Sequence, residues 1–414
     1  MGYAGLPLAV EFARAGFRVA GIEKNPDRCA AVNSAKSYIE DISDDDLKEA
    51  VGDGGLVATT SAEELSSCDV ALISVPTPLR KTKDPDISYI VEAVESIKEH
   101  LPNGSLVVLE STTYPGTCEE IIQPVFEERG LKMGKDMFLA FSPERVDPGN
   151  TTYRTQNIPK VVGGVTPRCT KVAVELYRTI VEEVVPVSST RVAEMVKLLE
   201  NTFRTVNISL INEFAMMCGK MGIDVWEVID AAATKPFGFM AFYPGPGLGG
   251  HCLPVDPLYL SWKARLMDIE AGFIDLSTRV NSAMPQYVVS KVVDALNSEQ
   301  KCVNGSRILI LGVSYKKNVS DTRESPAAEI MHHLEEKGAE ISYSDPLVPE
   351  FSYGEKVLQA EPLTAELLSR HDCAVIVTNH DAMDTKLVVE HSHIVVDTRN
   401  ATKNIDGKAR IVKI

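Results

Sequence analysis

A cysteine in a loop rich in glycine and proline is the side chain of this sequence best placed for nucleophilic chemistry. Residues 244–257 read Pro-Gly-Pro-Gly-Leu-Gly-Gly-His-Cys-Leu-Pro-Val-Asp-Pro, so the carboxylate of Asp256 follows Cys252 by four residues. Glycines let a backbone approach a ligand closely, and prolines hold a loop rigid. An isolated cysteine is more often a small buried apolar side chain, but a thiol in such a loop is a candidate nucleophile. His251 beside it does not by itself make a catalytic dyad.

A second group of polar side chains follows a helical spacing. Glu194, Lys197 and Asn201 stand at i, i+3 and i+7, which places them on one face of a helix. On the pattern alone, a solvated polar stripe is the favoured interpretation. The alternative is a set of groups that stabilise negative charge in a site.

The start of the chain resembles part of a dinucleotide-binding fingerprint. Gly2-Tyr3-Ala4-Gly5 fits the second and third glycines of Gly-x-Gly-x-x-Gly, and a helix over Pro7 to Arg14 is expected to follow. Glu23 stands 18 residues after Gly5, near the spacing of the acid that binds the adenosine ribose. A carboxylate there repels a 2′-phosphate, so the pattern favours NAD over NADP.

The fingerprint also requires a strand before its first glycine. That strand is not in the sequence as given, so we expect about ten further residues upstream of Met1, forming an apolar strand that ends in glycine. Without the strand, cofactor binding is expected to be weaker.

Alternating strands and helices predict an α/β fold with two doubly wound domains. Buried strands are expected at 17–23, 69–75, 106–110, 138–141, 307–313, 340–343, 373–378 and 393–397. A helix is expected over 191–219, where no Gly or Pro occurs before Gly219, with Ser189 and Thr190 as candidate N-caps. The predicted domains are a Rossmann-like NAD-binding domain at 1–188, a central helical domain at 189–300 and a C-terminal Rossmann-like domain at 303–414. The first residues of the last range, 303–306, are expected to form a linker.

Composition excludes several classes of protein. The 414 residues carry a net charge of −16, which argues against broad binding to nucleic acid or anionic membranes. No apolar run approaches the length of a membrane span, and no signal peptide is recognised, so a cytoplasmic location is expected. The eight cysteines form no CxxC pair, and neither a disulfide framework nor a metal site is expected.

The cysteine loop and its continuation, Leu-Tyr-Leu-Ser-Trp-Lys-Ala-Arg at 258–265, resemble the UDP-glucose/GDP-mannose (nucleotide-sugar) 6-dehydrogenase family. The His-Cys-x-Pro-Val-Asp-Pro form resembles the branch that acts on UDP-N-acetylhexosamines. Lys-x-x-x-Asn at 197–201 and the segment Gly-Val-Ser-Tyr-Lys-Lys-Asn-Val-Ser-Asp-Thr-Arg-Glu-Ser-Pro at 312–326 also match the family. The resemblance covers nearly the whole chain.

The resemblance implies roles for individual residues, several of them in turns that follow predicted strands. The catalytic residues it implies are Cys252, Lys197, Asn201, Asp256, Glu144 and Thr112. The cofactor-binding residues are Gly2, Tyr3, Ala4, Gly5, Glu23, Pro76, Thr77, Thr112 and Arg323. The substrate-binding residues are Glu144, Arg145, Lys197, Asn201, Gly249, Lys316 and Lys317.

The implied reaction is an NAD-dependent, four-electron oxidation of a sugar CH2OH to a carboxylate through a thiohemiacetal and a thioester on Cys252. UDP-N-acetylglucosamine is the expected substrate, with the UDP-N-acetylmannosamine and UDP-glucose reactions as alternatives. A two-electron β-hydroxyacid dehydrogenase and a catalytically impaired UDP-sugar binder are more distant alternatives. A homodimer or higher homo-oligomer is expected, with the long helix at the interface.

Overall fold

The structure is a computed structural model that describes residues 1–39, 41–147, 149–150, 152–250 and 252–414. These residues form two compact units. The first consists of Met1–Glu200 and Leu258–Glu270, and the second of Asn201–Pro257 and Ala271–Ile414.

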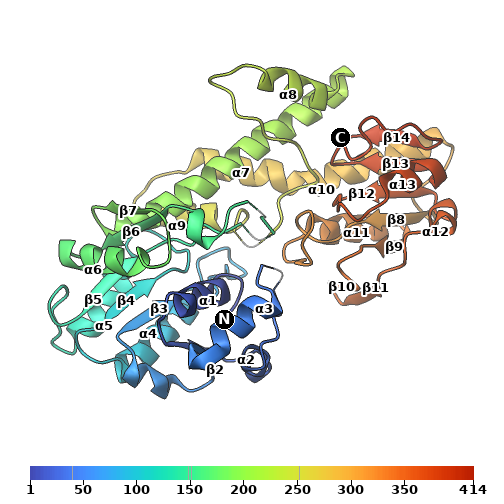
Figure 1. Cartoon of the computed structure of the whole chain (residues 1–414). Coiled ribbons are helices and arrows are strands. Elements are labelled where there is room, and N and C mark those ends of the chain that lie inside the picture. Colours follow the sequence, from blue (N-terminus) through green and yellow to red (C-terminus); the bar gives the residue numbers. More distant parts are fainter. Residues whose placement is uncertain (40, 148, 151, 251) are drawn as a thin grey trace. The chain divides into compact units, whose positions relative to one another are not determined.

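A five-stranded sheet forms the centre of the first unit (Figure 1). Its strands lie in the order β3 (Val70–Ile73), β4 (Leu106–Leu109), β5 (Phe138–Phe141), β6 (Lys160–Gly164) and β7 (Val184–Val187). All neighbours are parallel except β5 and β6, which pair antiparallel. The loops after β3, β4 and β5 therefore leave the same edge of the sheet, and β6 begins at that edge.

Both faces of this sheet are covered, and its central strands β4 and β5 carry apolar residues at every position. Val107, Leu109 and Phe141 pack on one face against α4 (Ser88–His100) and the segment η3–α5 (Cys118–Ile122, Gln123–Glu127). The alternate residues Leu106 and Val108 pack on the other face against α1 (Gly5–Arg14) and α6 (Pro167–Tyr177). This alternation is the period of two expected for strands buried on both sides.

A separate two-stranded parallel sheet pairs β1 (Val19–Ile22) with β2 (Leu56–Thr59). Helices α2 (Pro26–Asn33) and α3 (Asp44–Val51) pack with α1 around a third apolar cluster. The side chain of Asn25 caps α2, and Ser43 with Asp46 forms a capping box on α3. The short helical turns η1, η2 and η4 span Gly52–Gly54, Ala62–Ser67 and Thr155–Asn157.

Helix α7 (Thr190–Met221) is the longest element and belongs to both units in turn. Its first residues are fixed by Ser189, whose hydroxyl accepts a hydrogen bond from the N–H of Val192 at 3.3 Å. Helices α8 (Val225–Ala233), α9 (Asp256–Arg265) and α10 (Gly272–Ser298) follow along the chain.

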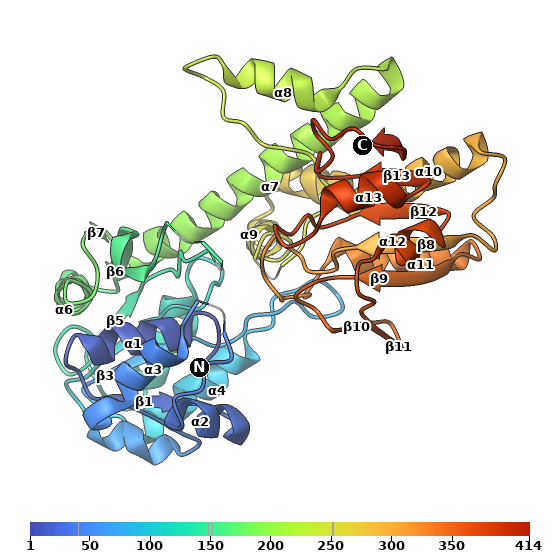
Figure 2. The same cartoon turned by 45° about the vertical axis from the view of Figure 1, so that its right-hand side comes forward.

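The second unit contains a five-stranded parallel sheet covered by helices on both faces (Figures 1 and 2). The strands lie in the order β14 (Arg410–Lys413), β13 (Ile394–Asp397), β12 (Cys373–Ile376), β8 (Arg307–Leu311) and β9 (Glu340–Ser344). Ile308 and Ile310 face α10 and α11 (Pro326–Glu336), whereas Leu309 and Leu311 face α12 (Ala365–Ser369) and α13 (Thr385–His391). A hairpin of β10 (Glu350–Tyr353) and β11 (Lys356–Gln359) follows β9.

The predicted fold class is confirmed, and each predicted strand overlaps an observed one. The antiparallel β6 was not predicted from the sequence. The predicted boundaries at 188 and 300 stay predictions. Among the residues described, no helix has both the length and the apolar character needed to cross a bilayer.

Candidate active site

The end of β5 holds Glu144 in a fixed orientation within the first unit. Its Oε1 accepts hydrogen bonds from the backbone N–H groups of Arg145 at 2.7 Å and Val146 at 2.8 Å. Its carbonyl oxygen accepts a hydrogen bond from Nζ of Lys197 on α7 at 2.5 Å. Two residues predicted to be catalytic are therefore brought together, although 53 positions separate them.

A buried ion cluster that the sequence did not predict lies behind Glu144. Nζ of Lys160, the first residue of β6, lies 3.0 Å from Oε2 of Glu110 and 3.3 Å from Oε2 of Glu144. The hydroxyl of Tyr177, at the end of α6, donates a hydrogen bond to Oε1 of Glu110. The side chains of Lys160 and Glu110 are only 5% and 1% exposed, so water screens this cluster very little.

The two carboxyl groups of this cluster have opposite pKa shifts. Burial alone would raise the pKa of Glu144, but Lys160, two backbone N–H groups and Lys197 hold it below its ordinary value. Burial raises the pKa of Glu110, and the attraction of Lys160 only partly offsets that effect. Of the two carboxyl groups, Glu144 therefore stays ionised to the lower pH, and a general base must be ionised to accept a proton.

Arg145 has protein partners in this structure. One of its terminal nitrogens donates to the carbonyl of Pro159 at 2.6 Å and the other to Oε1 of Glu200 at 2.6 Å. Its predicted contact with substrate stays a prediction.

The loops after β3 and β4 are tied together by Ser111. Its hydroxyl accepts a hydrogen bond from the N–H of Val75 at 2.8 Å and donates to the carbonyl of Val75 at 2.9 Å. This pairing places the loop of Pro76 and Thr77 beside the loop of Thr112. Pro76 is exposed, and Thr77 and Thr112 are half-buried, so all three are accessible at the sheet edge where ligands of such folds bind.

The fingerprint residues lie at the N-terminus of α1. The N–H of Leu6 donates to the carbonyl of Gly2, so Tyr3 and Ala4 form a turn that leads into α1 at Gly5. A Cβ on Gly2 would meet open space, which leaves the backbone there accessible to a phosphate at a helix N-terminus. Glu23 follows β1, where its carboxylate lies 3.1 Å from the ammonium of Met1.

The cysteine loop belongs to the second unit and is anchored on α7. Nδ2 of Asn201 donates a hydrogen bond to Oδ2 of Asp256, and both side chains are buried. Thr205, one turn further along α7, donates to the carbonyl of Leu253 at 3.1 Å. The N–H of Asp256 donates to the carbonyl of Cys252 at 2.8 Å, so this half-buried thiol lies one turn before α9. The adjacent His251 lies outside the described residues.

Two glycines of this loop are required by a contact within the protein. A Cβ on Gly249 would lie 2.7 Å from Cβ of Tyr315, and one on Gly250 would lie 2.9 Å from the Tyr315 ring. Gly250 also has φ +77°, and its N–H donates to the carbonyl of Arg323 at 3.0 Å. The loop therefore packs directly on the segment 312–326 that matched the family in sequence.

The basic residues of that segment have acidic neighbours. Lys317 pairs with Asp381 at 2.6 Å, and the guanidinium of Arg323 binds both oxygens of Asp321. Lys316 lies in the same segment, after Tyr315. The roles predicted for these three residues toward nucleotide are not tested by these contacts.

Arg399 is a residue of this site that the sequence analysis missed. It follows β13, where Nε donates to the carbonyl of Val377 at 2.8 Å. A Cβ on Gly245 would lie 2.7 Å from its Nη1, so the guanidinium lies against the start of the cysteine loop. Burial lowers the pKa of Arg399 to about 10, which still leaves it a cation at neutral pH. The sequence signal was an arginine two residues after a predicted buried strand.

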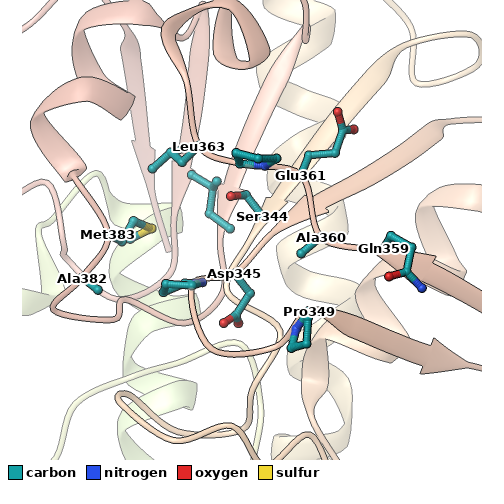
Figure 3. A pocket seen from close by; sticks show the side chains of 12 residues that line it. Ser344, Asp345, Pro349, Gln359, Ala360, Glu361, Leu363, Ala382 and Met383 are labelled. Carbon is teal, nitrogen blue, oxygen red and sulfur yellow. The ribbon is translucent and has the colours of Figure 1, made fainter.

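A cavity of about 550 Å³ opens at the carboxyl ends of β8 and β9 (Figure 3). Prolines, Leu363, Ala382 and Met383 line much of it. The Asp345 carboxylate accepts hydrogen bonds from the N–H groups of Val313 and Leu347. None of the predicted site residues lines this cavity, so it is not part of the candidate active site.

The polar face of α7 is buried rather than solvated. Glu194, Lys197 and Asn201 are 0%, 9% and 4% exposed. Glu194 accepts hydrogen bonds from the N–H groups of Gly116 at 2.6 Å and Cys118 at 3.0 Å, and so binds the loop after β4. The solvated stripe favoured by the pattern alone is wrong, and the same face contributes a structural carboxylate, an ammonium and an amide.

Three family models match the chain in succession. They describe the NAD binding, central and UDP binding domains of the UDP-glucose/GDP-mannose dehydrogenase family, at residues 1–181, 191–283 and 309–404. The chain belongs to this family. The expected use of NAD and the assignment to the UDP-sugar dehydrogenases, which are oxidoreductases, are thereby confirmed.

Known relatives differ in the sugar that their names specify. UDP-N-acetyl-D-glucosamine 6-dehydrogenase of Pseudomonas aeruginosa is 39% identical over 84% of this chain and 82% of its own length. UDP-N-acetyl-D-mannosamine dehydrogenase of Methanococcus maripaludis is 36% identical over 92% of this chain and 85% of its own. The solved UDP-D-ManNAc dehydrogenase from Pyrococcus horikoshii has a TM-score of 0.91 and 33% identity, covering 100% of this chain and 97% of that one.

Proposed function

We propose that this enzyme oxidises C6 of UDP-N-acetylglucosamine to the carboxylate in two steps on one cysteine. The observation that carries the proposal is the anchoring of the Cys252 loop on α7 through Asp256 and Asn201. Lys197 lies one helical turn before Asn201, about 6 Å along the axis. One helix thus carries a cation and an amide on the face that binds the loop.

Cys252 provides covalent capture in this mechanism. The first oxidation removes a hydride from C6 and a proton from its hydroxyl, giving an aldehyde. The thiolate adds to the aldehyde carbon, and the resulting thiohemiacetal loses a second hydride and a proton to become a thioester. Lys197 and Asn201 stabilise the oxyanion that forms at C6 in these steps. Bound NAD+ would accept the two hydrides, one molecule for each.

Glu144 acts in the last step. A water molecule adds to the thioester carbon as Glu144 accepts its proton, and the C–S bond then breaks to release the uronic acid and the Cys252 thiolate. The lowered pKa of Glu144 supports this role because a base must be ionised before it can accept a proton. Asp256 and Thr112 position the reacting groups.

NAD is assigned to the first unit. The accessible backbone at Gly2, the turn of Tyr3 and Ala4 that leads into α1 at Gly5, and the carboxylate of Glu23 fit a dinucleotide. We assign Pro76, Thr77, Thr112 and Arg323 to the same ligand. The pyrophosphate of the UDP-sugar is assigned to Lys316 and Lys317, and the sugar to Arg145 and Gly249.

The test is a panel of UDP-sugars offered with NAD+. UDP-N-acetylglucosamine should yield two NADH per sugar consumed and give the highest kcat/KM. A higher kcat/KM for the mannosamine epimer or for UDP-glucose would overturn the substrate assignment. A yield of one NADH per sugar would overturn the four-electron reaction. If no sugar gave NADH, the protein would be a UDP-sugar binder without this activity.

We also propose that the enzyme is a homodimer. Helix α7 presents large apolar side chains that are more than one third exposed, at a spacing of three, four or seven residues: Val192, Met195, Leu199, Phe203, Leu210, Phe214, Met217 and Met221. An apolar stripe of this length on one helix is typical of a surface that a second copy covers.

A further inference from the structure

We propose that Lys160 is a positioning residue for thioester hydrolysis, fixing the Glu144 carboxylate through its ammonium group with Glu110 as the opposing counter-charge. The inference deepens the proposed function and rests on the role of Glu144 given there. Lys160 itself is buried and contacts neither water nor substrate directly in this proposal.

Within the described part of the chain, the hydrogen bonds to Glu144 leave one acceptor position of its carboxylate for a water molecule. Its Oε1 already accepts two backbone hydrogen bonds, which use both lone pairs. Among the described residues, its Oε2 accepts one hydrogen bond, from Lys160, so one lone pair of that oxygen is left for a water proton. Because Lys160 is attached to the rigid strand β6, it sets where that lone pair points.

Lys160 is itself held from three elements. Glu110 from the end of β4 and Glu144 from the end of β5 lie on either side of Nζ. The ring of Tyr177 from α6 lies 5.2 Å from Nζ, and its hydroxyl binds Glu110. Lys197 from α7 is the other cation beside Glu144. With both carboxyl groups ionised, these four charged residues sum to zero.

This balance explains why a lysine occupies the start of an otherwise apolar strand. A lone buried cation would be costly, and so would two buried carboxylates 3.0 and 3.3 Å from an uncharged side chain. Removing Lys160 should protonate Glu144 as well as release it. An opposite charge at such distances lowers a carboxyl pKa by about 1–3 units.

The experiment follows breakdown of the covalent intermediate against pH, using UDP-N-acetylglucosamine and NAD+ with rapid quenching. Lys160→Met alone leaves two buried carboxylates, so the informative variant is Lys160→Met combined with Glu110→Gln, which removes one charge of each sign. Its thermal unfolding should be close to that of the wild type. In the pH profile of its hydrolysis rate, the fall on the acidic side (the acidic limb) should nevertheless occur at a pH about 1–3 units higher than in the wild type.

Two control variants isolate the effect. Glu110→Gln alone keeps the Lys160–Glu144 contact and should leave the limb in place. Lys171→Met removes an exposed lysine of α6 and should change neither stability nor the limb. If the double variant is too unstable, Lys160→Gln, which keeps an N–H donor without the charge, serves for the same measurement.

A folded double variant with an unshifted limb would overturn the positioning role. This outcome is separable from a failure of the proposed function, since Glu144→Gln tests that alone. If Glu144→Gln hydrolyses its intermediate at the normal rate, Glu144 is not the base. If it accumulates the intermediate while the double variant behaves as wild type, only the role of Lys160 is rejected.

Discussion

The ammonium group of Lys197, which is predicted to stabilise an oxyanion, lies beside the proposed base. Its ammonium lies 2.5 Å from the carbonyl oxygen of Glu144 and is 9% exposed, so it is a desolvated cation beside the proposed base. A charge in this position is more effective toward an oxyanion than a solvated one, because little water screens it.

Lys197→Ala should therefore lower kcat by about a hundredfold or more while changing KM little. Steady-state kinetics with UDP-N-acetylglucosamine measure both parameters, and Lys220→Ala, at an exposed position of the same helix, is the control. A rise in KM with an unchanged kcat would show that Lys197 binds substrate and does not stabilise the transition state.

The cluster around Glu144 also predicts a pH dependence of stability. Its pKa is held below the ordinary value of 4.5, so the carboxylate stabilises the fold above that pH and loses this contribution as the pH falls through the folded pKa. The difference in melting temperature between wild type and Glu144→Gln should shrink as the pH is lowered from 6 to below 4.5. A difference that stays constant or grows would contradict the assigned shift.

The sequence suggested candidate site residues that stand in motifs and gave no signal for residues that do not. Cys252, Lys197 and Asn201 were predicted because each belongs to a local pattern. Lys160, Glu110 and Tyr177 lie far apart in sequence and meet only through the ends of β4 and β6 and the end of α6. Their contact depends on sheet register, which no local pattern specifies.

At the scale of elements, α7 and the cysteine loop were predictable for different reasons. The absence of Gly and Pro before Gly219 predicted 191–219 as helix, and the observed bounds are Thr190–Met221. The antiparallel pairing of β5 with β6 was not predictable, because Lys160–Gly164 is short and ends in two glycines. The glycines of the loop were expected to let a ligand approach, which stays a prediction, and at Gly249 and Gly250 the missing side chain makes room for Tyr315.

Gly250→Ala should consequently displace the cysteine loop. The left-handed φ of +77° costs a non-glycine residue on the order of 1–3 kcal/mol, and the new Cβ would meet the Tyr315 ring at 2.9 Å. We expect a lower melting temperature and a loss of turnover. Gly272→Ala is the matched control, since its Cβ would meet nothing within 4 Å. Wild-type turnover in Gly250→Ala would contradict this account of the loop.

At the scale of the whole molecule, the apolar stripe on α7 predicts the oligomeric state. Sedimentation of the wild type should give the mass of a dimer, and Leu210→Glu, at a position 46% exposed on the stripe, should shift it toward the monomer. Lys220→Glu, which places the same charge at an exposed lysine, should leave the dimer intact. A wild type that sediments as a monomer would contradict the proposed interface.

Mass spectrometry of Glu144→Gln after incubation with UDP-N-acetylglucosamine and NAD+ tests the central claim most directly. The account predicts a sugar nucleotide bound covalently to the protein, at the oxidation level of the acid, on the peptide that contains Cys252. The adduct should be absent when Cys252→Ala is combined with Glu144→Gln. Full formation of the uronic acid by Cys252→Ala alone, or an adduct on any other residue, would contradict it.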